Sequence, residues 1–286
     1  MQKVAIVTDG GYGLSKKILE EYDISLVPYG LYIDGKEYKT DIDITTDKLM
    51  KIINEKKVNP KTSSISLGDL INVYKFLKKN NKSIISIFMS EKLSTATFDI
   101  LKIAKKNLDN DIEIIDSLQA GPGKELIVLE AAKLAKTGKN SKEVSDYARE
   151  VISKTNSIYG VPDLMYLYRG GRIGRARALM GSAMNVIPIV AIRDMEGTVS
   201  PIGKGNNFLK VNEQIIEIIK KDLVKLKATK IKICIIEQAD NIAASQHLRK
   251  VLEENIKCDE ILEADLGCTA LVHLGPKSWG IGYYVI

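Results

Sequence analysis

Small hydroxyl-bearing residues follow several apolar runs of the sequence, and their types and spacing suggest a site that binds a polar group. Thr8-Asp9 ends the first run, Ser90 and Ser94 follow the run at 84–89, and Asp116-Ser117 ends the run at 112–116. Thr62-Ser63-Ser64 stands just ahead of a predicted helix. Ligands of open parallel sheets bind beyond the carboxyl ends of the strands, so we expect these side chains to meet in one crevice.

The chemistry of this set favours binding over bond making. A serine at the start of a helix, as predicted for Ser94, offers its hydroxyl together with free backbone N–H groups and the positive end of the helix dipole, which suits a carboxylate. His273, in the sequence His-Leu-Gly-Pro, is a single imidazole without the partners that a catalytic triad or a metal site needs. The alternative that Thr62 and Ser94 are only helix caps stays open, because Ser and Thr favour such positions.

Other classes of site have little support in the sequence. The glycine turn after Asp9 lacks the GxGxxG pattern, and residues 197–204 miss the phosphate-loop pattern by one residue. The net charge is +6 with scattered lysines, which does not indicate nucleic-acid binding. Three cysteines without CxxC spacing favour a reduced compartment and no metal. Neither the apolar run at the N-terminus nor the run at 178–192 suits a signal peptide or a membrane span, so we expect a cytoplasmic protein.

Residues 160–192 combine arginines, glycines and a methionine-rich apolar run. Arg169, Arg172, Arg175 and Arg177 stand beside glycines there, although lysine is the commoner cation elsewhere. One interpretation is a helix start with solvated arginines. The other is a docking surface beside a cavity. The planar guanidinium of arginine forms bidentate hydrogen bonds with a partner, and the flexible methionine side chain adapts to apolar ligands. The residues expected to line that cavity are Met180, Met184, Val186 and Ile187.

The elements that would position these residues alternate between strand and helix. Strands are predicted at 4–8, 24–33, 84–89 and 112–116, and helices at 14–22, 47–57, 67–79, 94–108 and 124–136, with caps at Thr46 or Asp47 and at Ser66. A helix capped by Ser141 follows, then a strand at 157–161, a hairpin of 189–193 with 198–202, helices at 209–226 and 243–254, and strands at 232–236 and 261–264. This pattern predicts an N-terminal α/β lobe (1–159) with a mainly parallel sheet, a C-terminal mixed α/β lobe (160–286), and a ligand between them.

Several motifs together give the chain a resemblance to a known family. They are Val7-Thr-Asp9, Val27-Pro28, Thr62-Ser63, Leu93-Ser94, Asp116-Ser117, Leu167-Tyr-Arg-Gly-Gly-Arg-Ile173 and His273-Leu-Gly-Pro276. Nearly end to end, the chain resembles the DegV family, the fatty-acid-binding subunits of bacterial fatty acid kinase. The resemblance implies two α/β lobes that enclose one long-chain fatty acid. It also implies that the protein transfers no phosphoryl group itself, needs no cofactor, and presents the acyl carboxyl to a separate ATP-dependent kinase subunit.

The resemblance also assigns residues. We expect the carboxyl group to be bound by Thr62, Ser63, Ser94, Thr95 and His273. A supporting network or a partner contact is expected from Arg172, Gly10 and Asp116.

The sequence departs from the family pattern at three places near the expected head group. Gly10 stands where the family has serine, Thr95 where it has glycine, and Lys277 where it has glycine. Two other functions stay open: an enzyme acting on a small carboxylated or phosphorylated metabolite between the lobes, with Asp9, Asp116 or His273 as acid or base, and a regulatory module that senses lipid through its arginine surface.

Overall fold

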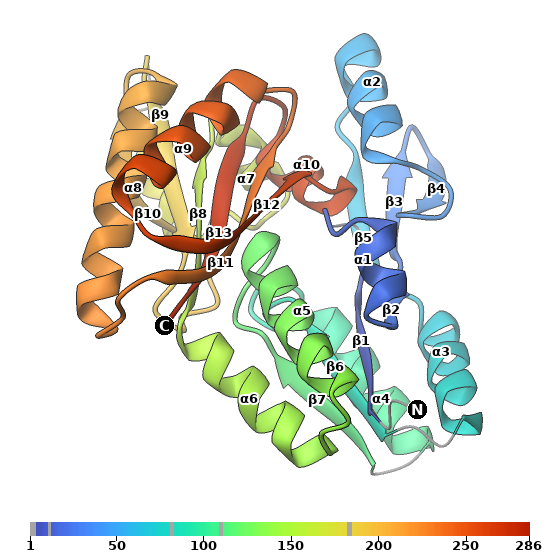
Figure 1. Ribbon diagram of the computed structural model, residues 1–286. Helices are drawn as coiled ribbons and strands as arrows, with labels where there is room; N and C mark the ends of the chain where they lie inside the picture. The colour runs from blue at the N-terminus through green and yellow to red at the C-terminus, as the bar shows by residue number, and fades with distance from the viewer. Residues whose placement is uncertain (1–3, 11–12, 81–82, 109–110, 182–184) are drawn as a thin grey trace.

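Four strands rich in isoleucine and valine form a parallel sheet in the first part of the chain (Figure 1). The computed structural model describes residues 4–10, 13–80, 83–108, 111–181 and 185–286. The strand order is β2-β1-β6-β7, with β1 at Val4–Asp9, β2 at Ile24–Val27, β6 at Ser83–Phe88 and β7 at Ile112–Asp116. All three pairings are parallel, as the alternation of strands and helices predicted.

Helices cover both faces of this sheet. One face packs against α3 (Leu67–Lys79) and α4 (Thr95–Leu108). The other packs against α1 (Lys16–Glu21), α5 (Pro122–Lys136) and α6 (Ser141–Ser153). Ser66 caps α3 as predicted, since its hydroxyl accepts from the backbone N–H of Asp69.

Two predicted caps and one predicted strand are wrong. Helix α2 (Thr46–Lys56) is capped by Thr45, and α6 by Asn140, whose side chain forms a capping box with Glu143. The single strand predicted for residues 24–33 is divided at Pro28 into β2 and β3, which belong to different sheets. Proline has no N–H for the ladder, so the chain leaves the parallel sheet there.

A small antiparallel sheet follows from this division. Its order is β4-β3-β5, with β3 at Tyr29–Ile33, β4 at Lys36–Lys39 and β5 at Lys61–Ile65. The β3–β4 turn is at Asp34 and Gly35, both of which have positive φ (48° and 78°), as a two-residue hairpin requires.

A six-stranded mixed sheet forms the second part of the chain. Its order is β10-β9-β8-β13-β11-β12, with β8 at Thr155–Gly160, β9 at Ile187–Ile192, β10 at Ser200–Gly205, β11 at Ile231–Gln238, β12 at Cys258–Asp265 and β13 at Trp279–Val285. Only the β11–β12 pairing is parallel among these strands. The predicted pairing of β9 with β10 is confirmed. Since β8 belongs to this sheet, the predicted boundary after residue 159 falls at the end of that strand.

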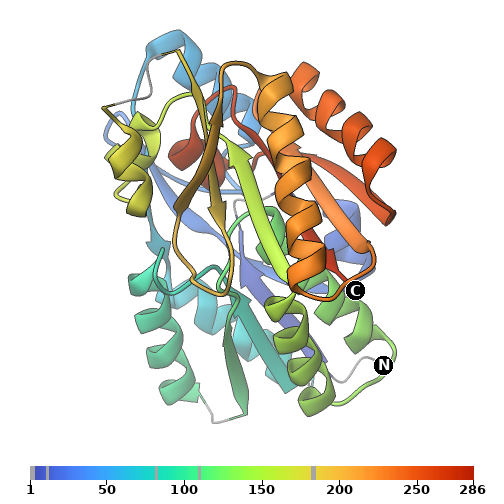
Figure 2. The same cartoon turned by 90° about the vertical axis from the view of Figure 1, so that its left-hand side faces the viewer.

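Helices again lie on both faces of the mixed sheet. The long helices α8 (Phe208–Lys225) and α9 (Ile242–Asn255) cover its outer face, and Figure 2 shows α8 in front of the strands. Short helices near its inner face are α7 (Met165–Arg169), the 3₁₀ helix η1 (Gly174–Leu179) and α10 (Cys268–Leu274).

Helix α5 lies between the two large sheets and is buried on nearly every side. It packs in one apolar cluster with Ile6 and Ile85 of the parallel sheet and with Ile233 and Ile235 of the mixed sheet. The lobes therefore share a core element. Among the described helices, none is long and apolar enough to cross a membrane.

Candidate functional site

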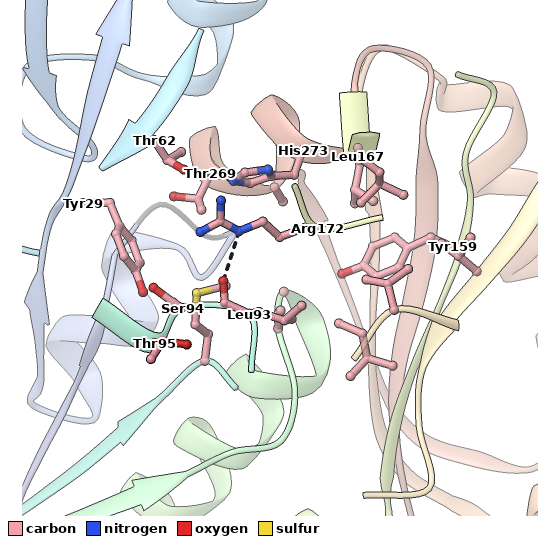
Figure 3. A pocket seen from close by; sticks show the side chains of 18 of the residues that line it. Tyr29, Thr62, Leu93, Ser94, Thr95, Tyr159, Leu167, Arg172, Thr269 and His273 are labelled. Carbon is pink, nitrogen blue, oxygen red and sulfur yellow. Dashed lines mark hydrogen bonds between the residues drawn. The ribbon is translucent and has the colours of Figure 1, made fainter. Parts of the chain in front are cut away.

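A pocket lies where the small sheet, the start of α4, helix α10 and strands β8 and β9 come together (Figure 3). It encloses about 900 Å³ free of protein atoms, part of it open to solvent. Hydroxyls, an imidazole and a guanidinium gather at one end: Tyr29, Thr62, Ser64, Ser94, Thr269, Arg172 and His273. The remaining lining is mostly apolar and includes Met89, Leu93, Ala120, Leu167, Val190, Ile192, Val199 and Leu274.

Four hydroxyls at or next to the polar end come from β5 and from the start of α4. Strand alternation directs Thr62 and Ser64 to the same side of β5. The hydroxyl of Thr62 lies 3.0 Å from Nε2 of His273. The hydroxyl of Thr97 lies 2.8 Å from that of Ser94 and 3.0 Å from that of Ser64. Two short chains of hydrogen bonds thus converge on the pocket, one ending at an imidazole and the other at the start of a helix.

A buried ion pair stabilises the hydrogen-bonded chain formed by Ser64, Thr97 and Ser94. The hydroxyl of Thr97 donates to the Tyr29 oxygen at 3.3 Å, and the Tyr29 hydroxyl donates to Asp9 at 2.8 Å. Asp9 is paired with Lys124 of α5 at 3.0 Å, with both side chains buried. Burial, and then the charge of Asp9, raises the pKa of Tyr29 well above its ordinary value. Tyr29 therefore stays protonated and fixes Thr97 in place.

His273 is a neutral imidazole at physiological pH. Burial, and then the charge of Arg172, lowers its pKa to about 3. Its ring borders the pocket, but Nδ1 is buried and has no hydrogen-bond partner among the described residues. Gly170 lies against that nitrogen, where a Cβ atom would overlap it. Glycine is required here because the backbone of the arginine-rich turn approaches the ring so closely.

Arg172 crosses the polar end and is held by backbone carbonyls. Its Nε donates to the carbonyl of Leu93 at 3.0 Å and its Nη1 to that of Gly170 at 2.6 Å. The first bond ties the arginine-rich turn to the segment that carries Ser94. Arg172 thus places a positive charge beside the hydroxyl groups, where an anion would be stabilised.

Thr269 presents a hydroxyl that the protein leaves unsatisfied. It lies four residues before His273 on α10, so both side chains project from the same face of the helix toward the pocket. Its Oγ1 is buried and has no hydrogen-bond partner in the described part of the chain. A buried hydroxyl without a partner is destabilising, so this atom is suited to a ligand oxygen.

The other predicted site residues are distributed differently. Ser63 lines the pocket, but its hydroxyl is on the Gly30 side of β5. Thr95 is exposed at the mouth, and its hydroxyl donates to the carbonyl of Glu91. Gly10 and Asp116 are not among the lining residues; Asp116 accepts from the N–H of Leu118 at the end of β7.

The structure explains two departures from the family pattern. A Cβ atom on Gly10 would overlap the Asp41 carboxylate, so that carboxylate occupies the space of the missing side chain. Lys277 has a φ of 64°, the left-handed conformation that glycine adopts more readily. Its exposed ammonium group pairs with Asp240 at 2.6 Å, and Lys277 is not among the residues that line the pocket.

The methionine-rich wall is not found where it was expected. Met180, Val186 and Ile187 are not among the pocket residues, and Met184 lies outside the described residues. Met180 packs at the edge of an apolar cluster, and Ile187 packs on the outer face of the mixed sheet. Strand β9 contributes Val190 and Ile192 to the pocket instead.

The residues that sequence analysis missed are Tyr29, Thr97, Tyr159 and Thr269. Two of them had a usable pattern. Thr97 is three residues after Ser94, which is the spacing of one helical turn, and Thr269 is four residues before His273. The second pattern is informative only if residues 268–274 are known to be helical, and that short helix was not predicted.

A pair of buried glutamates lies beside the pocket where α5 meets β11. Glu125 accepts from the N–H of Gly13 at 2.7 Å, whereas neither oxygen of Glu237 has a hydrogen-bond partner among the described residues. Burial raises the pKa of Glu125 from 4.5 to about 7, and burial together with the Glu125 charge raises that of Glu237 well above its ordinary value. The pair therefore retains a proton at neutral pH.

Replacing Glu237 by glutamine is expected to stabilise the protein at pH 8. A carboxyl whose pKa is raised by folding stabilises the fold below its unfolded pKa and loses that contribution as pH rises through its folded pKa. For Glu125 the loss extends from about pH 4.5 to about pH 7, and the raised pKa of Glu237 acts in the same direction. The variant should gain about 1–3 kcal/mol at pH 8 and little at pH 5. Thermal unfolding of the ligand-free proteins between pH 5 and 8 measures the difference.

The exposed Glu254→Gln is the matched control, because it removes a carboxylate from the surface of α9. His273 has the same surroundings in all three proteins, so its contribution to the pH dependence of stability cancels in the comparison. Equal pH dependence of wild type and Glu237→Gln would show that the glutamate pair is fully ionised.

The arrangement can bind an anionic group attached to an apolar chain. Asp9 is engaged with Lys124 and Tyr29, and His273 is a very weak base, so neither is placed to act as an acid or base at neutral pH. In the ranges that the structure describes, no three His, Cys, Asp or Glu side chains are grouped so that they could hold a metal.

The sequence and the fold are similar to those of known proteins. The model of a family described as uncharacterised proteins of the DegV family matches residues 3–285. A DegV domain-containing protein from Clostridium perfringens is 30% identical over 284 residues, 98% of each chain. A DegV family protein from Thermus thermophilus, whose structure is described for its fatty acid binding, has a TM-score of 0.91 at 24% identity over 99% of this chain and 100% of its own. A stearic-acid-binding protein from Eubacterium ventriosum has a TM-score of 0.87 at 23% identity over 100% and 98%.

Proposed function

We propose that this chain, which belongs to the DegV family, binds one long-chain fatty acid and presents its carboxyl group to a separate ATP-dependent kinase subunit. The carboxylate is held at the polar end of the pocket, and the acyl chain lies along the apolar lining. The observation that carries the proposal is the unsatisfied hydroxyl of Thr269 beside Ser94, Thr62, His273 and Arg172. Fatty acid binding by proteins of the same fold from Thermus thermophilus and Eubacterium ventriosum supports it.

The physical chemistry of the two parts of the pocket matches the two parts of the ligand. A hydrogen bond to a charged group contributes ~1.5–3 kcal/mol. A buried methylene group contributes ~0.8 kcal/mol. Because a long acyl chain has many methylene groups, the apolar lining supplies most of the affinity and the hydroxyl groups orient the carboxylate.

A kinase partner is proposed because the sequence shows no motif for binding ATP. Neither the glycine turn after Asp9 nor the segment 197–204 has the phosphate-loop pattern, so ATP binding is assigned to another subunit. Arg172 was expected either in the site network or in the partner contact. Its bonds to the carbonyls of Leu93 and Gly170 favour the network.

Native mass spectrometry of the protein purified from cells tests the binding proposal. We expect one acyl chain per monomer, which organic extraction removes and added oleate restores. A protein that carries no lipid and binds neither palmitate nor oleate would refute it. Incubation with oleate, ATP and the fatty acid kinase subunit of the same organism tests the partnership. Acyl phosphate should form only when all four components are present.

Replacing Thr269 by valine should weaken fatty acid binding while stabilising the empty protein. Valine has the shape of threonine without the hydroxyl, so the unsatisfied buried oxygen disappears from the unliganded state. We expect about a tenfold loss of oleate affinity, the lower range for a hydrogen bond to a charged group, and an unchanged or higher Tm. Titration calorimetry and thermal unfolding give the two quantities. Undiminished affinity would mean that the carboxylate does not reach Thr269.

A further inference from the structure

Tyr159 brings a polar group into the apolar part of the pocket. Among the described residues that line the pocket, it is the one polar side chain that comes from the mixed sheet. It lies on β8 opposite Val190 of β9, and both side chains belong to the same apolar cluster. Figure 3 shows Tyr159 across the pocket from Tyr29, Thr62 and Ser94, with its hydroxyl pointing into the pocket. This hydroxyl therefore faces the acyl chain of a bound fatty acid and not its carboxylate.

Two glycines fix the Tyr159 side chain in place. A Cβ atom on Gly280 of β13 would overlap its ring, and a Cβ atom on Gly121 at the start of α5 would overlap its hydroxyl oxygen. The backbone thus approaches the side chain from two directions, as only glycine allows. Because the ring is held so closely, the hydroxyl presents its proton at a fixed position in the pocket.

The Tyr159 hydroxyl is a hydrogen-bond donor without an acceptor. Burial, and then the charges of Glu237 and Glu125, raises the pKa of Tyr159 well above its ordinary value, so the hydroxyl keeps its proton at physiological pH. The residue is only 4% exposed, and no group in the described part of the chain forms a hydrogen bond with its hydroxyl. A buried donor without an acceptor is destabilising, so an acceptor on the ligand would be favoured here.

We propose that the pocket accepts a fatty acid whose chain carries an oxygen substituent, a keto or hydroxyl group, and that Tyr159 selects it by donating a hydrogen bond to that oxygen. This inference rests on the proposed function, because it requires the acyl chain to lie along the apolar lining. An oxygen that faces only side chains such as Val190 and Ile192 would lose its hydrogen bonds to water without replacement. Tyr159 therefore selects for the position of the oxygen along the chain. A carbon–carbon double bond is a much weaker acceptor than an oxygen atom.

The test compares stearate and oleate with a series of ketostearates that carry the oxygen on carbon 6, 8, 10, 12 or 14. A ketone accepts a hydrogen bond and has no proton of its own to satisfy. Displacement of a fluorescent fatty acid gives the affinities. In wild type we expect one position to bind within about threefold of stearate, and the positions that face the apolar lining to bind about tenfold or more weakly.

Tyr159→Phe isolates the contribution of the hydroxyl, because phenylalanine keeps the ring between the two glycines. The favoured ketostearate should lose about tenfold in affinity. Stearate should bind equally well or better, because the unsatisfied donor is gone. Tyr168→Phe is the matched control: this tyrosine of α7 is exposed and is not in the pocket lining, so no affinity should change by more than about twofold.

The outcomes separate this inference from the function on which it rests. If wild type binds none of these acids, the proposed function fails. If stearate binds but all ketostearates are equally weak in wild type, Tyr159 selects no oxygen and the inference is wrong, whether or not the variant folds. If Tyr159→Phe weakens every acid to the same extent, the hydroxyl contacts the carboxylate instead. If it weakens oleate alone, the hydroxyl contacts a double bond. Either result would overturn the assignment to an oxygen substituent.

Discussion

Oleate affinity is expected to fall at least about a hundredfold when Thr62 and Ser94 are both replaced by alanine. Each hydroxyl lines the polar end of the pocket, and each hydrogen bond to a carboxylate is worth ~1.5–3 kcal/mol. The variant should still fold, because Thr97 retains Ser64 and Tyr29 as partners when Ser94 loses its hydroxyl. Displacement of a fluorescent fatty acid measures the affinity, and thermal unfolding confirms that the protein is folded.

Two variants make this result specific. Thr95→Ala removes the neighbouring hydroxyl, which is exposed and bonded to the Glu91 carbonyl, and should change affinity less than about threefold. Thr62→Ser keeps the hydroxyl that contacts His273 and should bind oleate almost normally. If the double variant binds like wild type, or if Thr95→Ala is equally harmful, the carboxylate lies elsewhere.

Affinity should also rise steeply with acyl chain length. Each added methylene group that enters the apolar lining contributes ~0.8 kcal/mol, which is about a fourfold gain in affinity. The step from a 10-carbon to a 16-carbon acid should therefore improve the dissociation constant by about three and a half orders of magnitude. Displacement titrations with saturated acids of even length, each kept below its micellar concentration, measure the slope.

The change of affinity with chain length shows whether the acyl chain is buried in the pocket or only the head group is bound. The methyl esters of the same acids are the control: they keep the chain and lose the charge, so they should follow the same slope with a weaker intercept. A flat series would show that the chain stays in solvent. A series that levels off at one length would give the reach of the apolar lining.

The architecture was largely predictable because its strands and helices are long and strongly patterned. The isoleucine runs at β6 and β7, each followed by a predicted helix, predicted the parallel sheet and its covering helices correctly. The small sheet was missed. Its strands β4 and β5 are short and polar, so their hydrophobic pattern is weak, and β3 is separated from β2 only by the effect of Pro28.

Some residues of the site could be predicted from sequence motifs, whereas others are identified only by the three-dimensional structure. Thr62, Ser94, His273 and Arg172 were found as motif residues, and the structure brings all four to one pocket. Their roles as ligand contacts stay predictions. The apolar lining from β9 could not be inferred from composition, because the methionine-rich run precedes it by only a few residues and appeared the better candidate for a flexible wall.

Helix α5 bears on how a ligand enters and leaves. Both large sheets pack on this helix. A hinge motion that separates the two lobes would therefore expose its isoleucine and leucine side chains to water. Each such side chain costs ~1.5–3 kcal/mol to expose. Exchange is therefore expected through local movement at the mouth of the pocket, with a long residence time for the acyl chain. A slow dissociation rate would let the loaded protein carry its lipid from one encounter to the next without losing it on the way.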